Sequence, residues 1–180
     1  MNGRVSNVHL EREHRFSKHA VEELTLVAGM GVVGDAHFGA TVRHRSRVDA
    51  DPSQPNLRQV HLMHNELFEE LSRAGFEVQP GDLGENITTE GVDLLGLPVG
   101  TVLRFERGPL VAITGLRNPC LQIERFRAGL LNEVLGRKDD GAVLRRAGVM
   151  GVVLLGGVVR RDDGLHVALP PRPHVALDRV

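Results

Sequence analysis

Short runs of valine, leucine and isoleucine recur along this chain, separated by glycine or aspartate turn signals. Apolar runs of roughly four to eight residues between turn signals are typical of β-strands. Many such strands joined by glycine-rich turns favour a barrel or a sandwich. We therefore predict a mainly β fold with a few α-helices. The predicted strands are Arg4–Leu10, Thr25–Val27, Gln59–Met63, Glu85–Thr88, Thr101–Arg107, Leu110–Thr114, Gly151–Leu155 and Leu165–Leu169.

Two segments have helical rather than alternating spacing of their apolar residues. The first is His64–Ala74, which Gly75 ends, and the second is Leu121–Leu135, which Gly136 ends. Their apolar stripes consist of Leu67, Phe68 and Leu71 in the first, and of Ile123, Phe126, Leu130, Leu131 and Val134 in the second. A glycine after the last periodic residue is a common helix stop signal. Both stripes are most simply the sides of helices that face a core.

The longest apolar run, Val149–Val159, has about half of the ~20 residues that a membrane helix needs. Its glycines and valines predict a buried pair of strands. The first residues are polar and lack the apolar core of a secretory signal peptide. A single cysteine, Cys120, cannot form an internal disulfide, which fits a reducing compartment. We expect a soluble, cytoplasmic protein with an extended tail over residues 170–180.

A chain of 180 residues is long enough for one domain with a sizeable core. We expect residues 1–180 to form that single domain, with its core in about residues 1–170. The 22 lysines and arginines nearly balance the 23 aspartates and glutamates, so the overall charge does not indicate a nucleic acid or a membrane as partner. Nearly all basic residues are arginine. This bias suits phosphate or carboxylate binding, and a GC-rich coding sequence produces it equally well.

The polar segment Phe38–Leu57 has no regular pattern, and loops of this length are usually functional or disordered. Arg43, Arg45 and Arg58 lie in or beside it. We propose these three arginines as candidates for binding a phosphate, on charge alone, because a guanidinium matches phosphate with two parallel hydrogen bonds.

Local motifs with a known mechanism are absent from the sequence. It contains no phosphate-binding loop, no dinucleotide fingerprint, no nucleophile elbow and no CxxC or HExxH pair. His61 and His64 form an HxxH pair, but a strand would point them in different directions, so we do not expect a zinc site. We expect these two histidines and His37 to be solvated or core residues.

The most informative local feature is the segment GLRNPCLQI, in which Cys120 follows an Arg-Asn-Pro corner. Pro119 restricts Asn118 to extended backbone, so the preceding strand ends in a fixed turn. A thiol at the start of the following helix would ionise more readily, and the cation of Arg117 acts in the same direction. A thiolate is both a nucleophile and a metal ligand. The alternative is that Cys120 is a small buried hydrophobic residue.

Five motifs occur in order: GVVGDAHFG, RQVHLMHNEL, PGDLGENITTEGVDLLGLPVGT, GLRNPCLQI and RRAGVMGVVLLGGVV. In this set and order the chain resembles the MOSC domain family, named for the carboxyl-terminal domain of molybdenum cofactor sulfurases. The resemblance covers about residues 1–170 and is greatest to the small stand-alone bacterial members. It implies a MOSC-type β-barrel with a few flanking helices.

The resemblance also implies that Cys120 is the functional residue. In family members that bind the molybdenum cofactor the corresponding cysteine supplies a thiolate to molybdenum, and in others it is proposed to carry sulfur. Asn86 resembles an asparagine near the cofactor, with Glu85 beside it. Arg117 and Asn118 belong to the cysteine motif, and Arg117 would pair with the cofactor's phosphate or with an oxyanion. The three loop arginines are candidates for the pterin phosphate.

Three hypotheses follow for the function. The first is a molybdenum-dependent oxidoreductase that acts on N-oxygenated or similar small substrates, with electrons from a separate donor protein. The second is a sulfur carrier that receives a persulfide on Cys120 from a cysteine desulfurase and delivers it to metal–sulfur centres. The third is a non-catalytic β-barrel binding module, which burial of Cys120 among apolar side chains would favour. The pyridoxal-phosphate domain of the sulfurases has no counterpart in this sequence, so we do not expect that cofactor here.

Overall fold

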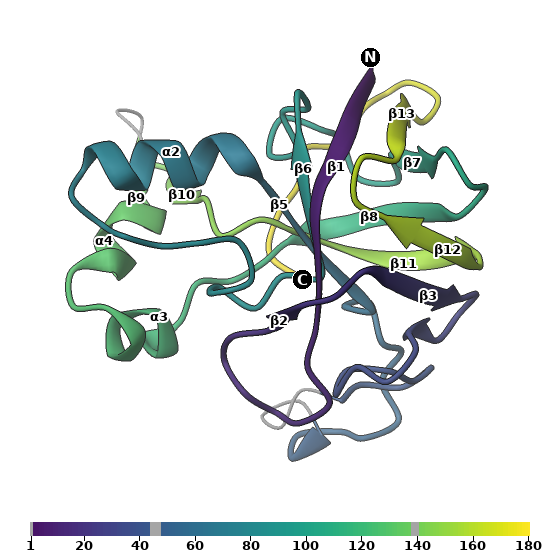
Figure 1. Ribbon diagram of the computed structural model, residues 1–180, viewed down its shortest axis with the longest axis horizontal. Coiled ribbons are helices and arrows are strands. Elements are labelled where there is room, and N and C mark those ends of the chain that lie inside the picture. The colour runs from purple at the N-terminus through teal and green to yellow at the C-terminus, as the bar shows by residue number, and fades with distance from the viewer. Residues whose placement is uncertain (1, 44–47, 138–140) are drawn as a thin grey trace.

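A seven-stranded sheet closes on itself to form the barrel of this protein (Figure 1). The computed structural model describes residues 2–43, 48–137 and 141–180. The strands follow the order β13-β7-β8-β11-β5-β6-β1, and β1 pairs with β13 to close the barrel. The barrel strands are β1 (Asn2–Leu10), β5 (Val60–His64), β6 (Ile87–Glu90), β7 (Val102–Phe105), β8 (Leu110–Leu116), β11 (Val149–Leu155) and β13 (Gly164–Ala168). All neighbours in the barrel are antiparallel except β5 and β6.

The remaining strands lie outside this ring. Strand β2 (His19–Ala20) pairs with the end of β1. A second sheet has the order β12-β3-β4 and consists of β3 (Glu23–Val27), β4 (Gly31–Val32) and β12 (Gly157–Arg160). Strands β9 (Leu135–Arg137) and β10 (Val143–Arg145) form a short ribbon.

Three short helices gather on one side of the barrel (Figure 1): α2 (Asn65–Arg73), α3 (Leu121–Phe126) and α4 (Leu130–Val134). Helix α2 follows β5 and precedes β6, as expected because parallel neighbours need a crossover connection. Among the described residues, none of the helices has the length and hydrophobicity required to cross a membrane.

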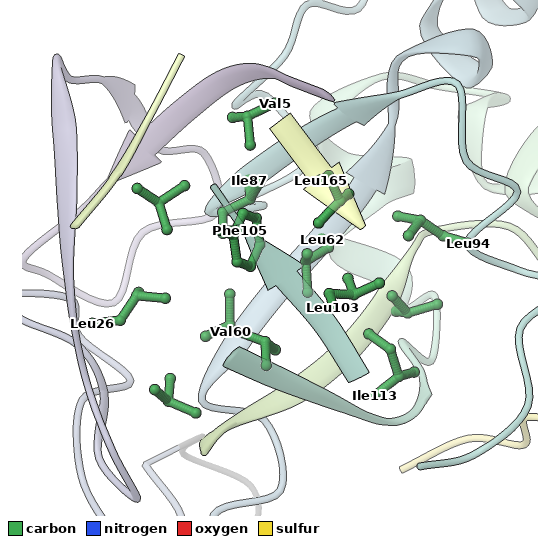
Figure 2. Packing of buried hydrophobic residues seen from close by; sticks show 14 of the residues in the cluster. Val5, Leu26, Val60, Leu62, Ile87, Leu94, Leu103, Phe105, Ile113 and Leu165 are labelled. Atoms are coloured by element: carbon green, nitrogen blue, oxygen red, sulfur yellow. The ribbon is translucent and has the colours of Figure 1, made fainter. Parts of the chain in front are cut away.

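Two separate cores hold these elements together. The barrel interior is filled by aliphatic residues and Phe105 (Figure 2). Successive side chains of a strand point to opposite faces of the sheet, so in β8 alternate residues such as Val111 and Ile113 point into the barrel. The second core lies between the helices and the outside of the barrel. Its buried members are Met63, Leu67, Phe68, Leu71, Val78, Leu83, Ile123, Leu130, Val134 and Ala147.

The fold class predicted from the sequence is confirmed, and each predicted strand overlaps an observed one. The single helix predicted over Leu121–Leu135 is wrong. Arg127 is extended and Gly129 has a φ of 84°, so the segment breaks into α3 and α4 before continuing into β9. The run Val149–Val159 does contain two strands, but β12 pairs with β3 rather than with β11.

Candidate functional site

A cavity of about 620 Å³ opens beside the start of α3. Its wall is built from loops that are far apart in sequence, so the fold and not any local motif assembles it. The lining residues are His14, Arg15, Phe16, Lys18, His37, Val42, Arg43, Asn56, Arg58, His61, Gly84, Asn86, Arg117, Asn118, Cys120, Gln122, Met150, Arg179 and Val180. Among the residues that the structure describes, the lining includes five arginines and one lysine but no aspartate or glutamate, so it favours an anionic ligand.

Cys120 lies on this wall, immediately before the first residue of α3. Strand β8 ends at Leu116, the backbone N–H of Arg117 donates to the carbonyl of Gly148 (3.0 Å), and the buried Pro119 turns the chain. Cys120 is half-buried, and its thiol donates to Oε1 of Gln122 at 3.5 Å. The sulfur is therefore not sealed in a core, which removes the observation that would have favoured a purely structural cysteine.

Arg117 places an incompletely paired guanidinium in the same wall. The guanidinium carbon lies 5.7 Å from the centre of the Phe16 ring, and Nη1 is buried without a hydrogen-bond partner. Burial lowers the pKa of Arg117, and the neighbouring Cys120 and Glu85 act against that shift. Arginine remains a cation under such conditions. An unpaired buried N–H on a cation is costly, and a bound anion would satisfy it.

A buried ion pair between Lys18 and Asp35 supports the floor of the cavity. Their side chains are 5% and 1% exposed, and Nζ of Lys18 contacts Oδ2 of Asp35. The same Oδ2 accepts a hydrogen bond from Nδ2 of Asn86 (2.8 Å). Burial opposes ionisation of Asp35, but the hydrogen bond from His37 and the charge of Lys18 outweigh it and hold the pKa of Asp35 well below its usual range. Burial lowers the pKa of Lys18, and the charge of Asp35 and the hydrogen bond to it act against that shift.

Asn86 ties this ion pair to the barrel. Its Oδ1 accepts from the backbone N–H of His61 (3.2 Å), and its own N–H donates to the carbonyl of His61 (2.8 Å). Burial, followed by the charge of Arg117, lowers the pKa of His61 well below its usual value, so the ring is neutral. Its Nε2 lies 2.8 Å from the carbonyl oxygen of Ala147, and therefore carries the hydrogen. His61 is thus a fixed structural member of the wall.

The other site residues expected from the sequence divide into three groups. Arg43, Arg58 and Asn118 line the cavity. Glu85 does not: it is fully buried behind the wall, its Oε1 accepts hydrogen bonds, among them one from Thr88 Oγ1 (3.2 Å), and burial raises its pKa. Arg45 lies outside the described residues.

Several lining residues were not expected from the sequence. Lys18 could have been singled out, because it is one of only two lysines in the chain. Arg179 and Val180 had no such signal. They reach the cavity because the tail runs beside β8, where the N–H of Leu116 donates to the carbonyl of Asp178 (2.8 Å) and the N–H of Val180 donates to the carbonyl of Leu116 (3.2 Å).

Within residues 2–43, 48–137 and 141–180, no three histidine, cysteine, aspartate or glutamate side chains are grouped closely enough to hold a metal ion. Since protein metal sites usually need three or four such ligands, the described residues do not form a metal site by themselves. Cys120 could supply one ligand to a metal that arrives with its other ligands already in place.

Comparison with known proteins identifies relatives of this chain. The family model described as "MOSC domain" matches residues 33–166. The structure is similar to that of the YuaD protein from Bacillus subtilis, at 23% identity and a TM-score of 0.77 over 93% of this chain and 96% of that one. It is also similar to YiiM from Escherichia coli, at 19% identity and a TM-score of 0.65 over 97% of this chain and 73% of that one. No curated protein matches the sequence.

Proposed function

Because the chain belongs to the MOSC domain family, which is linked to molybdenum-cofactor-related proteins, we propose that it binds the molybdenum cofactor with the Cys120 thiolate as a ligand of molybdenum. The observation that carries this proposal is the position of Cys120. This half-buried cysteine lies on the wall of a cavity in which every charged side chain of the described lining residues is a cation. A soft thiolate beside cations suits a soft metal carried by an anionic group.

The residues present fit such a group. A volume of about 620 Å³ is in the ordinary range for a small-molecule cofactor. The unpaired Nη1 of Arg117 and the lining residues Arg43 and Arg58 would hold the phosphate or another oxyanion of the cofactor. The oxygen and the nitrogen of the Asn86 side-chain amide are both hydrogen-bonded within the protein. We therefore assign Asn86 a role in positioning the floor of the cavity.

We further propose that the protein is an oxidoreductase that reduces N-oxygenated small molecules. For an N-hydroxylated amine the balance is R–NH–OH + 2 e⁻ + 2 H⁺ → R–NH₂ + H₂O, in which the N–O bond breaks and the oxygen leaves as water. A separate electron-donor protein supplies the two electrons. When bound, the cofactor would supply two-electron oxygen-atom-transfer chemistry. The chain's own residues would bind and orient the substrate and exchange protons with it.

Metal analysis of protein produced in a host that makes the cofactor tests this proposal. We expect the wild type to carry about one molybdenum atom per chain, and Cys120→Ser to carry almost none, because an alcohol is a poor ligand for a soft metal. Gln122→Ala is the matched control. It lies on the same wall and contacts the sulfur, but it leaves the thiol in place, so it should retain molybdenum. Negligible molybdenum in the wild type and Cys120→Ser alike would reject the proposal.

One observation favours a second candidate, a sulfur carrier. Cys120 is the only cysteine, so a persulfide on it has no second thiol in the chain that could displace it as a disulfide. In this reaction the Cys120 thiolate attacks the outer sulfur of a desulfurase persulfide, and the desulfurase cysteine leaves as a thiolate. Intact-mass spectrometry after incubation with a cysteine desulfurase and free cysteine should show one added sulfur atom. No added sulfur, with the thiol still reactive toward an alkylating reagent, would contradict this candidate.

A further inference from the structure

His37 lies on the cavity wall with its backbone fixed on both sides. Its N–H donates to Oδ1 of Asp35 (2.9 Å), and its carbonyl accepts from Nδ2 of Asn56 (2.9 Å). The amide of Asn56 also donates to the carbonyl of Gly39 (2.9 Å). Asn56 is 4% exposed, so a buried side chain holds the loop that carries His37. A surface histidine without a role does not require such support.

The ring of His37 is also oriented. Its Nδ1 lies 3.1 Å from the same Oδ1 of Asp35, and the ring is 29% exposed while the carboxylate is 1% exposed. Because Asp35 is ionised and therefore accepts hydrogen bonds only, Nδ1 must carry a hydrogen in both protonation states of the ring. The proton that His37 can gain or lose is consequently the one on Nε2.

Buried carboxylate–histidine pairs of this kind fix the tautomer of a ring that exchanges protons. Here the carboxylate is held in turn by Lys18 and Asn86, so it is not available to move with the ring. His37 thus combines an oriented ring, one defined exchangeable proton and access to the cavity.

Among the described residues, two neighbouring segments bring further titratable or charged groups close to His37. The ring of His14 lies 5.5 Å away, centre to centre, and its Nε2 donates to the carbonyl of Arg43 (3.0 Å). Lys18 lies behind Asp35. His14 itself is exposed to solvent.

From this arrangement we propose that His37, positioned by Asp35, is the proton donor to the substrate bound in the cavity. The inference rests on the proposed function, because reduction of an N-oxygenated substrate consumes two protons. His37 delivers one of them from Nε2 and recovers it from solvent, and the other comes from solvent directly. Asp35 does not touch the substrate and is a positioning residue.

The decisive variant is His37→Asn, because the amide Nδ2 of asparagine replaces Nδ1 as a donor to Asp35 but cannot release a proton. We expect its molybdenum content to match that of the wild type, and its kcat with an N-hydroxylated amine to fall at least about 100-fold, the lower end of what general acid catalysis contributes. The wild-type rate should decline at high pH, where a protonated donor is no longer available, and this decline should vanish in the variant. His166→Asn is the matched control, because this histidine lies on the exposed face of β13 outside the cavity lining, and it should keep both the rate and its pH profile.

A second measurement does not depend on the cofactor. Nitrogen NMR of the imidazole rings in the isolated protein should show neutral His37 with its hydrogen on Nδ1, and Asp35→Ala, which removes the acceptor, should abolish this preference. A hydrogen on Nε2 in the neutral wild-type ring would overturn the inference. So would a molybdenum-loaded His37→Asn variant with unchanged rate and pH profile. Lack of molybdenum in the wild type would instead overturn the proposed function, so the two failures can be told apart.

Discussion

Replacing Lys18 with methionine should destabilise the protein far more than removing a comparable ion pair from its surface. Methionine keeps most of the buried volume but leaves the Asp35 carboxylate, 1% exposed, without its cation. Breaking a buried pair in this way costs about 3–5 kcal/mol. The matched control is Arg160→Met. Its pair with Glu23 has a good distance of 2.6 Å, but both side chains are nearly half exposed, so its loss should cost at most about 1 kcal/mol.

The measurement is urea unfolding followed by far-ultraviolet circular dichroism, because the chain has no tryptophan or tyrosine for fluorescence. The double variant Lys18→Met/Asp35→Asn should recover part of the loss, since an amide at position 35 is neutral and can still accept from His37. A coupling free energy of about 1–3 kcal/mol between the two positions is expected for groups in direct contact.

The pH dependence gives an independent check. The pKa of Asp35 is held below its unfolded value of about 3.9. Its contribution to the free energy of unfolding is therefore complete above that pH and is lost as the pH falls toward the folded pKa. Without Lys18 the folded pKa of Asp35 rises, so the difference between variant and wild type should shrink below about pH 4. A loss under about 1 kcal/mol at neutral pH, or a difference that stays constant into acid, would refute this account of the ion pair.

Two further predictions concern the cavity wall. Arg117→Met should weaken the binding of inorganic phosphate by about tenfold or more, because a hydrogen bond to a charged group contributes about 1.5–3 kcal/mol. Isothermal titration calorimetry measures this affinity, and Arg104→Met, on the exposed face of β7, is the control. Equal weakening in the two variants would show that the effect is not local to the cavity. Gly84→Ala should destabilise the protein more than Gly75→Ala. Both glycines have positive φ (82° and 88°), but a Cβ at position 84 would run into the carbonyl oxygen of Phe16 whereas a Cβ at position 75 meets nothing. We expect about 1 kcal/mol for the strain at position 75 and clearly more at position 84, and equal midpoints in urea would contradict the role of the contact.

The barrel could be predicted from the sequence because its signals are local. The apolar run that forms β8 and the glycine turns between strands are visible in single segments of the chain. Helix α2 was equally clear, since its stripe and its final glycine agree. The break between α3 and α4 was not, because the apolar spacing continues across it, and the chain leaves the helix through the extended Arg127 and the positive φ of Gly129. A glycine inside a periodic run can either be tolerated or end the helix, and tertiary packing decides which.

The candidate site was predictable only in part, because tertiary packing brings its residues together from distant parts of the sequence. The Arg-Asn-Pro corner identified Cys120 and Arg117, which lie together on the wall. Glu85 and Asn86 are adjacent in sequence and both precede β6, but one lies behind the wall and the other on it, which their adjacency alone does not predict. Lys18 enters through a loop that only the closed barrel places near Cys120.

The path of the tail has a practical consequence for work with this protein. Val180 lies at the cavity, whereas the amino-terminal end of β1 points away from it (Figure 1). An affinity tag or fluorescent label attached after Val180 would start at the cavity wall and would compete with a bound ligand for space. Attached ahead of Asn2, the same tag would leave that opening clear, so binding and kinetic measurements should use amino-terminal fusions.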